Sequence, residues 1–319
     1  MLKARIAGIG YYVPENVVTN NDLKKYMDTS DEWIQERTGI VERRYANRTG
    51  ETTTTMAVEA AKIAIERAGT TAQDIDFIIF ATLSPDYYFP GCGVLLQRAM
   101  QMKEIGALDI RNQCSGFVYA LSVADQFIKT GMYKNILVVG SEKHSFGLDF
   151  NTRGRNVSVI FGDGAGAVVL QPAKKENQGI LSTHLHSDGA SAEILAMYNP
   201  GTHANHWVPQ AVANFDEAEI GQMFMSHTMI DEAQNFPNMD GPAVFKKAII
   251  KMPEVVQEAL ATNNLTPADI DLLIPHQANL RIAQFVQQKL NLRDDQVFNN
   301  IQKFGNTTAA SVPIALCEA

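Results

Sequence analysis

The sequence predicts an α/β fold built from two related halves. Runs rich in β-branched residues alternate with helix-like segments, most clearly in a helix over 57–69 followed by a buried strand over 77–81. A similar segment recurs later, because residues 71–79 (TAQDIDFII) match residues 266–274 (TPADIDLLI). Such self-similarity indicates a duplicated supersecondary unit, although two amphipathic helix–strand units can also resemble each other by chance.

A looser repeat supports the same architecture. Residues 107–118 and 297–309 each combine a short strand, a turn of small residues and the start of a helix. A duplicated unit would place the two helix starts around a pseudo-two-fold axis. We therefore expect Cys114 and Asn306, which lie in these two turns, to face one another.

We place the two halves of the chain at 1–172 and 173–319. Two segments interrupt the alternating pattern of strands and helices. The glycine-rich run 162–167 leads into a strand-like run rather than a helix, so it does not predict a dinucleotide-binding loop; we expect a tight hairpin between buried strands. Residues 190–240 lack periodicity and form an excursion between the halves. Methionines in it suit either a cover over an apolar tunnel or ordinary packing of a cap: Met197, Met223, Met225, Met229 and Met239.

Composition bounds the function. The 319 residues are 45% apolar and 19% charged, which suits a globular protein with about two core-bearing units. No run approaches the roughly 20 apolar residues of a membrane span, and the N-terminus lacks the features of a signal peptide. A net charge of −8 argues against general nucleic-acid binding. Cys92, Cys114 and Cys317 have no metal-ligand spacing, so a reducing cytoplasm and no metal are expected.

Cys114 is the first candidate for chemistry. It lies between the strand-like residues 108–110 and a predicted helix over 116–128. A thiol at a helix N-terminus gains thiolate character from the free N–H groups and the helix dipole, which favours attack on a thioester. A buried structural cysteine is the alternative.

His276 and Asn306 are the other two candidates. His276 follows a strand end and precedes a helix, where it could serve as a rigidly held donor or base, or as a hydrogen-bonded core histidine. Asn306 precedes an alanine-rich helix, so its amide could donate to an oxyanion or simply cap that helix. The pairs His184/His186 and His203/His206 have no cysteine or carboxylate cluster beside them, so they do not predict a metal site.

These motifs together resemble one family, the β-ketoacyl-acyl carrier protein synthase III enzymes. The resemblance covers nearly all of residues 3–319 apart from the excursion. Its most specific segments are DTSDEWIQERTGI (28–40), CSGFVYALSVADQFIKTG (114–131), IFGDGAGAVVL (160–170), PHQANLRI (275–282) and GNTTAASVPIAL (305–316).

The resemblance implies a thiolase-like, five-layered αβαβα fold and a dimer. It also implies a catalytic triad of Cys114, His276 and Asn306 with no cofactor. An acyl-CoA would first acylate the cysteine. Malonyl-acyl carrier protein would then lose carbon dioxide, and its enolate, stabilised by the histidine and asparagine, would attack the acyl-cysteine to give a β-ketoacyl product.

Further site residues follow only from the resemblance. Trp33 and Arg37 match positions that sandwich the CoA adenine, joined by Arg153 or Arg155, between which the sequence does not decide. Phe89 matches a residue that crosses the dimer interface to close the partner's acyl pocket. Basic residues on two predicted helices match a docking patch for the acidic carrier protein, with a solvated helix face as the alternative: Lys246, Arg281 and Lys289.

The sequence also departs from the family pattern. The excursion is long and Asp86-Tyr87-Tyr88 precedes Phe89, which favours a medium-chain acyl donor over acetyl-CoA. Family members continue beyond the position of Ala319 with a central strand and a Gly-Gly-Gly loop of the oxyanion hole. A chain ending at Ala319 is expected to be partly unfolded or inactive, so we expect the sequence to be incomplete.

Three other functions remain open. A condensing enzyme or acyltransferase of secondary metabolism would use the same triad. A Cys-His-Asn hydrolase is disfavoured because the flanks of Cys114 lack a papain-like signature. A catalytically inactive partner subunit is the non-enzymatic alternative, although such subunits typically lose the nucleophile.

Overall fold

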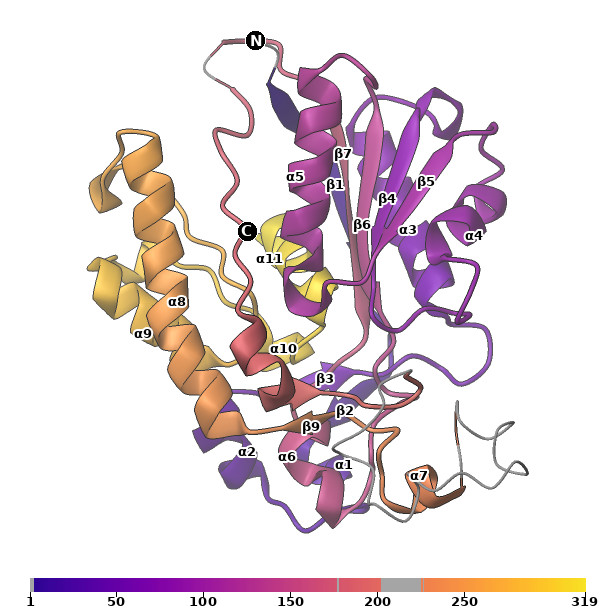
Figure 1. The fold of residues 1–319 in the computed structure, drawn as a ribbon, viewed down its shortest axis with the longest axis vertical. Helices are drawn as coiled ribbons and strands as arrows, with labels where there is room; N and C mark the ends of the chain where they lie inside the picture. The colour runs from indigo at the N-terminus through magenta and orange to yellow at the C-terminus, as the bar shows by residue number, and fades with distance from the viewer. Residues whose placement is uncertain (1–2, 177, 202–224, 226) are drawn as a thin grey trace.

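One mixed sheet forms the centre of the first half of the chain (Figure 1). The computed structural model describes residues 3–176, 178–201, 225 and 227–319. The sheet order is β1-β7-β6-β4-β5, with β4 parallel to β5 and β6 and with β7 antiparallel to β1 and β6. Its strands are β1 (Ala4–Tyr12), β4 (Phe77–Ala81), β5 (Gly106–Ile110), β6 (Ile136–Glu142) and β7 (Gly164–Pro172). The strand predicted over 77–81 is confirmed.

Helices cover both faces of this sheet (Figure 1). One face packs against α3 (Thr53–Arg67) and α4 (Cys92–Ala99), the other against α5 (Gly116–Lys129) and α11 (Ser311–Glu318). α3 begins four residues before the predicted start because Thr52 caps it, its side chain accepting from the Thr55 N–H. The alanine face of α3 lies directly on β1, where a Cβ on Gly8 would overlap the carbonyl oxygen of Ala64.

The second half contributes two further layers. α8 (Gly241–Thr262) and α9 (Leu280–Leu290) pack together on the outside of the molecule. Extended segments of chain run between this helix pair and α5 with α11 (Figure 1). The order of layers is therefore αβαβα, as expected. Within the described residues, however, the fourth layer is not a regular sheet: one isolated parallel bridge joins Leu273 to Val297.

An open, largely apolar cavity of ≈ 480 Å³ lies in this fourth layer, between α5 and α8. Its apolar lining comes from both helices and from the extended segment after β7, and includes Val118, Leu121, Ile180, Leu181, Val255 and Val256.

The internal repeat is visible in local geometry. Thr71 caps η1 (Ala72–Asp74) and Thr266 caps η6 (Pro267–Asp269), each through a capping box with the aspartate three residues later. The two caps have nearly the same backbone angles, φ −120° and ψ 165° against φ −121° and ψ 166°. The first copy continues into β4, and the second continues into the bridge at Leu273. The boundary between the halves at 172/173 stays a prediction.

Several smaller elements lie outside the central sheet. They are β2 (Val17–Thr19), α1 (Asn20–Leu23), α2 (Asp31–Thr38), β3 (Glu42–Arg44), η3 (Thr152–Gly154), α6 (Arg155–Ser158), η7 (Asp294–Gln296) and α10 (Ile301–Phe304). Arg43 on β3 is fully buried and donates to the carbonyl oxygens of Val18 (3.3 Å) and Val159 (2.8 Å), so it joins three of these segments.

The hairpin predicted for the glycine run 162–167 is wrong. The run leads into β7 as expected, but the residues before it form α6 and a single bridge at Phe161 rather than a strand. Glycine is required at Gly162 for another reason, because a Cβ there would overlap the carbonyl oxygen of Phe304. The rejection of a dinucleotide-binding helix is confirmed.

The excursion over 190–240 is described in part. It contains η4 (Gly189–Ile194), α7 (His227–Asp231) and a two-residue ladder of β8 (Leu195–Ala196) with β9 (Asn238–Met239). Met239 packs against a buried cluster of Leu148, Val157 and Phe161. Met223, His203 and His206 lie outside the described residues.

Candidate active site

Cys114 lies in a tight turn between β5 and α5. The turn is η2 (Gln113–Ser115), and Gln113 has a left-handed backbone with φ 45°. At the start of α5, a Cβ on Gly116 would lie 3.1 Å from Ala81 and 3.6 Å from Ala309, so the helix end fits closely between the sheet and the second half of the chain.

The environment of Cys114 disfavours the thiolate. Burial raises its pKa to about 12, and the nearby carboxylate of Glu142 acts in the same direction. This contradicts the lowered pKa expected from the helix N-terminus. A helix end typically contributes only about 0.3–1 kcal/mol, which desolvation of the thiol outweighs here.

His276 presents one ring nitrogen to the site. Its Nδ1 lies 2.6 Å from the hydroxyl of Ser311, whereas its Nε2 is buried without a hydrogen-bond partner among the described residues. Burial lowers the pKa of His276 to about 4, so the ring is neutral at pH 7. A buried, unpaired ring nitrogen costs free energy, which an incoming substrate atom would recover.

Asn306 is held on three sides. Its backbone N–H donates to the Ile160 carbonyl oxygen (2.9 Å), and its own carbonyl oxygen accepts from the Gly162 N–H (3.1 Å). Its side-chain Oδ1 accepts from the Thr308 N–H at 2.8 Å. Because the oxygen of the amide is occupied, its Nδ2 points away from this bond. The residue therefore makes a capping bond with its oxygen and leaves its donor for other use.

The three candidates converge on the N-terminal end of α11. The turn of Cys114 packs against η8 (Thr308–Ala310), which directly follows Asn306. Ser311, the partner of His276, is the first residue of α11. A thiol, a neutral imidazole and an amide from both halves of the chain thus meet at one sheet end, as the repeat predicted for Cys114 and Asn306.

Sequence reasoning missed a second polar group at this sheet end. Glu142 and His144 are buried, and both contact the side chain of Thr308. The available signal was a glutamate at the end of the otherwise apolar run over 136–141.

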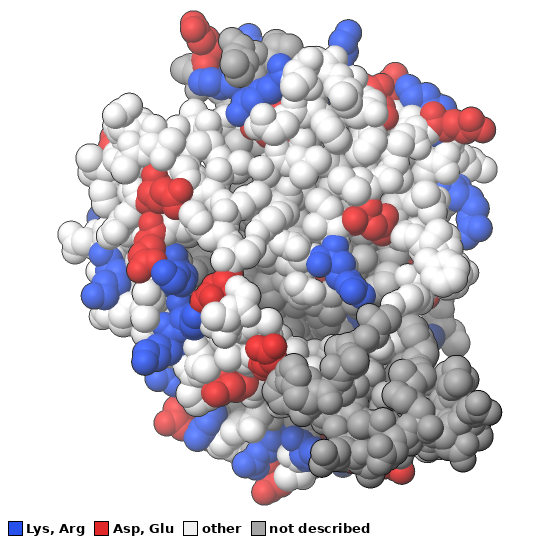
Figure 2. Space-filling model, viewed as in Figure 1, with Lys and Arg blue, Asp and Glu red and all other residues white. Residues whose placement is uncertain are grey.

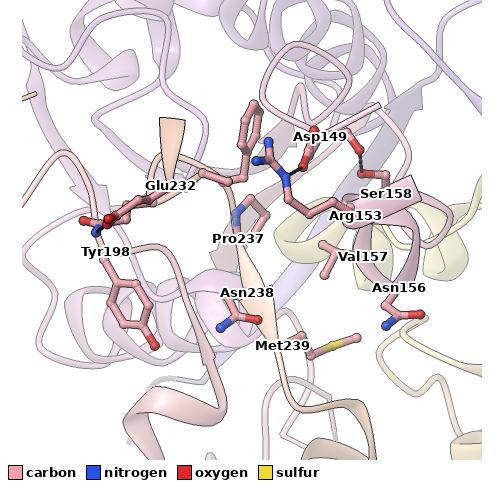
Figure 3. Close-up of a pocket in the computed structure, with 14 residues that line it drawn as sticks. Asp149, Arg153, Asn156, Val157, Ser158, Tyr198, Glu232, Pro237, Asn238 and Met239 are labelled. Atoms are coloured by element: carbon pink, nitrogen blue, oxygen red, sulfur yellow. Dashed lines mark hydrogen bonds and ion pairs between the residues drawn. The ribbon is translucent and has the colours of Figure 1, made fainter. Parts of the chain in front are cut away.

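A cluster of two arginines around Trp33 forms a second site. The guanidinium carbon of Arg37 lies 4.5 Å from the indole centroid, and that of Arg155 lies 5.1 Å from it. Arg153 is placed elsewhere: its Nε binds Asp149 at 2.8 Å. Figure 3 shows Arg153 directed toward Asp149. Both residues line a cavity of ≈ 270 Å³, which is also lined by Tyr198. The structure therefore pairs Arg155, and not Arg153, with Trp33.

Phe89 lies on an exposed aromatic loop between β4 and α4. It is 81% exposed, and its neighbours Tyr87 and Tyr88 are exposed as well. β5, an edge strand that pairs only with β4 among the described residues, also exposes Leu108. Such an uncovered edge with apolar side chains is typical of a surface that another chain covers.

The predicted docking residues lie on the outer helix pair. Lys246 is on α8, and Arg281 and Lys289 are on α9, all three exposed. Arg281 lies over the ring of Phe245 at 5.4 Å. On this face of the molecule, the basic side chains of α8 lie toward its N-terminal end and the acidic ones toward its C-terminal end, so α8 does not form one uniform basic surface (Figure 2).

His184 and His186 share one acidic partner. His184 and His186 both bind the carboxylate of Glu258, at 3.0 Å and 2.6 Å. Within residues 3–176, 178–201, 225 and 227–319, no group of three or more His, Cys, Asp or Glu side chains is arranged to hold a metal ion. Across the same part of the chain, no helix combines the length and apolarity that a bilayer crossing requires.

Known proteins agree with this architecture. Family models for 3-oxoacyl-[acyl-carrier-protein (ACP)] synthase III match residues 108–189 and, for the C-terminal part, residues 260–319. A β-ketoacyl-[acyl-carrier-protein] synthase III of Bacillus anthracis is 44% identical over 313 residues, covering 98% of this chain and 88% of that relative.

Solved structures give the same result. The 3-oxoacyl-[acyl-carrier-protein] synthase III of Aquifex aeolicus VF5 has a TM-score of 0.84 and 42% identity, over 99% of this chain and 90% of that one. The priming β-ketosynthase of the R1128 polyketide biosynthetic pathway has a TM-score of 0.83 and 31% identity, over 99% and 87%. The chain belongs to the β-ketoacyl-[acyl-carrier-protein] synthase III family of thiolase-fold condensing enzymes.

Proposed function

We propose that this chain condenses an acyl-CoA primer with malonyl-acyl carrier protein through an acyl-Cys114 intermediate, with His276 and Asn306 as the other catalytic residues. The observation that carries the proposal is the convergence of a thiol, an unpaired imidazole Nε2 and an amide Nδ2 at the start of α11. These groups supply a nucleophile and two neutral donors, which is what a Claisen condensation between thioesters requires. No metal or redox cofactor takes part in the proposed steps.

The first half-reaction transfers the acyl group. The Sγ of Cys114 attacks the thioester carbon of the acyl-CoA, the bond to the CoA sulfur breaks, and the thiol proton ends on the departing CoA thiolate. Because the pKa of Cys114 is raised to about 12, this proton leaves as the new bond forms rather than beforehand.

The second half-reaction forms the carbon–carbon bond. The malonyl group loses carbon dioxide, and the electron pair of the broken bond becomes an enolate whose oxygen accepts from His276 Nε2–H and Asn306 Nδ2–H. Donation by Nε2 requires the Ser311 hydroxyl to donate to Nδ1, which the 2.6 Å contact permits. The enolate carbon attacks the acyl-cysteine, and the released sulfur of Cys114 takes up one proton.

Intact mass after incubation with single acyl-CoAs tests the first half-reaction. We expect an acyl adduct on the wild-type chain and none on a Cys114→Ala variant, because Cys114 is the nucleophile. Cys92→Ala is the matched control, since Cys92 is fully buried in the hydrophobic core, whereas Cys114 is partly exposed. An adduct that survives Cys114→Ala would contradict the proposal.

The same experiment identifies the preferred chain length of the acyl primer. We propose a medium-chain acyl donor, on the support of the Asp86-Tyr87-Tyr88 segment before Phe89 and the long excursion. Turnover that falls steadily from acetyl- through butyryl- and hexanoyl- to octanoyl-CoA would refute this choice.

The cluster of Trp33, Arg37 and Arg155 is the proposed adenine site. An aromatic face with two guanidinium groups suits a purine and its phosphates. We expect Arg155→Ala to raise the KM for acyl-CoA about 10-fold, because one stacking and charge contact is lost, while kcat at saturation changes little. Arg153→Ala is the matched control, since that side chain binds Asp149 instead. Equal effects of the two substitutions in steady-state kinetics would contradict the assignment.

Partners follow from the surface. We propose that the acidic carrier protein docks on α9, because Arg281 and Lys289 are exposed there and the Asn279 side chain at the start of α9 donates to the Arg37 carbonyl oxygen (2.8 Å). Lys246 on α8 would extend this surface.

We also propose a homodimer through the β5 edge, in which Phe89 reaches the partner's acyl pocket. We further propose a cytoplasmic location, which suits the three free cysteines.

A second condensing function has one supporting observation. The R1128 polyketide priming β-ketosynthase is 31% identical, so a primer-loading role in secondary metabolism would use the same residues. Profiling of carrier proteins as acceptors separates the two functions. The inactive-subunit alternative is disfavoured because Cys114, His276 and Asn306 are all present.

A further inference from the structure

Glu142 is a buried carboxylate that the proposed mechanism does not use. It ends β6, is 0% exposed, and forms no ion pair with the described residues. Its Oε2 accepts from the hydroxyls of Ser84 (2.6 Å) and Thr82 (3.0 Å), and the backbone N–H of Leu83 adds a further bond (3.1 Å). A carboxylate enclosed in this way is costly to place and demands an explanation.

The two hydroxyls that bond to Glu142 each accept a hydrogen bond from a backbone N–H. The Ser84 hydroxyl accepts from the Lys143 N–H (2.9 Å), and the Thr82 hydroxyl accepts from the Ser84 N–H (3.1 Å). Each hydroxyl therefore has its own proton left for Glu142. Burial raises the pKa of Glu142, and the hydrogen bonds from these groups act in the opposite direction.

Glu142 does not serve to activate the nucleophile. A negative charge beside Cys114 raises the pKa of the thiol and so opposes thiolate formation. A role in catalysis must therefore run through another residue that Glu142 contacts.

Thr308 is that residue. Its hydroxyl donates to Glu142 and lies 2.9 Å from His144 Nε2. Because burial lowers the pKa of His144 to about 3, the ring is neutral, and it must donate from Nε2 since the threonine proton is already used. Two buried side chains thus hold one hydroxyl.

The backbone of Thr308 explains why it needs holding. Its φ is 45°, in the left-handed region that a β-branched residue rarely adopts. The N–H of this same residue donates to Oδ1 of Asn306 at 2.8 Å, the bond that turns Nδ2 of the amide away. Strain of this kind persists where the surrounding contacts over-determine it, and it is typical of functional sites.

We propose that Glu142, acting with His144 through Thr308, is a positioning residue that orients the Asn306 amide toward the enolate oxygen. The inference rests on the proposed function. It predicts that loss of the Thr308 hydroxyl impairs the second half-reaction and spares the first, because Asn306 donates only to the enolate.

Thr308→Val removes the hydroxyl and keeps the shape of the side chain. We expect acylation of Cys114, followed by intact mass in single turnovers, to stay within about 3-fold of wild type. We expect kcat for β-ketoacyl formation to fall about 10²-fold with little change in the KM for the malonyl carrier, as for a misoriented catalytic group. Thr308→Ser, which keeps the hydroxyl, should restore condensation to within about 3-fold.

Glu142→Gln and a control variant at a second threonine, Thr183→Val, complete the experiment. Glu142→Gln should show the same split as Thr308→Val, since it replaces one acceptor oxygen by an NH2 donor among hydroxyls that all donate to Glu142, and it decides the matter if Thr308→Val does not fold. Thr183→Val removes a hydroxyl that bonds only Ser122 (2.9 Å) and should leave both half-reactions unchanged.

The possible outcomes are distinct. Wild-type chain that forms no β-ketoacyl product would sink the proposed function. Active wild type with a Thr308→Val or Glu142→Gln variant that condenses at the wild-type rate, or that loses both half-reactions equally, would overturn only the role of Glu142.

Discussion

Replacing His276 with alanine is expected to lower the rate of condensation by about 10²–10⁴-fold while Cys114 is still acylated at close to the wild-type rate. The imidazole has its Nε2 free of hydrogen bonds among the described residues, so it is not paired with the thiol in the resting site. Its donor is needed only when an enolate oxygen develops. Single-turnover acylation followed by addition of malonyl-carrier protein measures the two steps separately.

His186→Ala is the matched control for this prediction. His186 is exposed and binds Glu258 on the surface, so its loss should affect neither half-reaction. If His276→Ala abolished acylation as well, the imidazole would have to act as the base for Cys114, and the assignment of His276 as an enolate donor would be wrong.

How much of the fold can be predicted depends on how local its causes are. The repeat is legible in the sequence because each copy begins with a capping box, Thr71 with Asp74 and Thr266 with Asp269, which spans only four residues. The fourth layer was not predictable in this way. Its apolar run at Leu273 resembles β4, but a strand also requires neighbours, and the described residues provide one bridge.

The site shows the same limit. Cys114, His276 and Asn306 were predicted because each lies in a short polar motif between apolar elements. The choice between Arg153 and Arg155 was not, since it depends on which side chain the fold places over the indole of Trp33.

The electrostatics were the least predictable part. The raised pKa of Cys114 depends on burial and on Glu142, which belongs to another strand and reaches the thiol only through the fold. Thr308 and His144 escaped notice for a similar reason. His144 lies outside the specific segments, and Thr308, although it lies within 305–316, has a left-handed backbone that no propensity predicts for threonine.

Gly140→Ala is expected to have the largest effect on stability. Gly140 lies on β6, fully within the sheet, and a Cβ there would overlap the carbonyl oxygen of Ala309 and lie 3.2 Å from the Ala310 nitrogen. Both are backbone atoms of η8, so relief requires the main chain to move. We expect the free energy of unfolding to fall by about 3 kcal/mol, at the upper end of typical overpacking costs, as measured by denaturant titration. Gly189→Ala is the control, because nothing lies within 4 Å of its Cβ position.

The kinetics of the folded Gly140→Ala protein should differ from those of His276→Ala. Displacing η8 shifts Asn306, which precedes it in the chain. It also presses Ala309 toward Gly116 at the start of α5, the helix that follows Cys114; a Cβ on Gly116 would lie only 3.6 Å from Ala309. Acylation and condensation should therefore fall together, each by at least about 10-fold. A variant that lost condensation alone would mean that η8 can move without disturbing the turn of Cys114, and that the two halves meet less rigidly at this sheet end than their packing indicates.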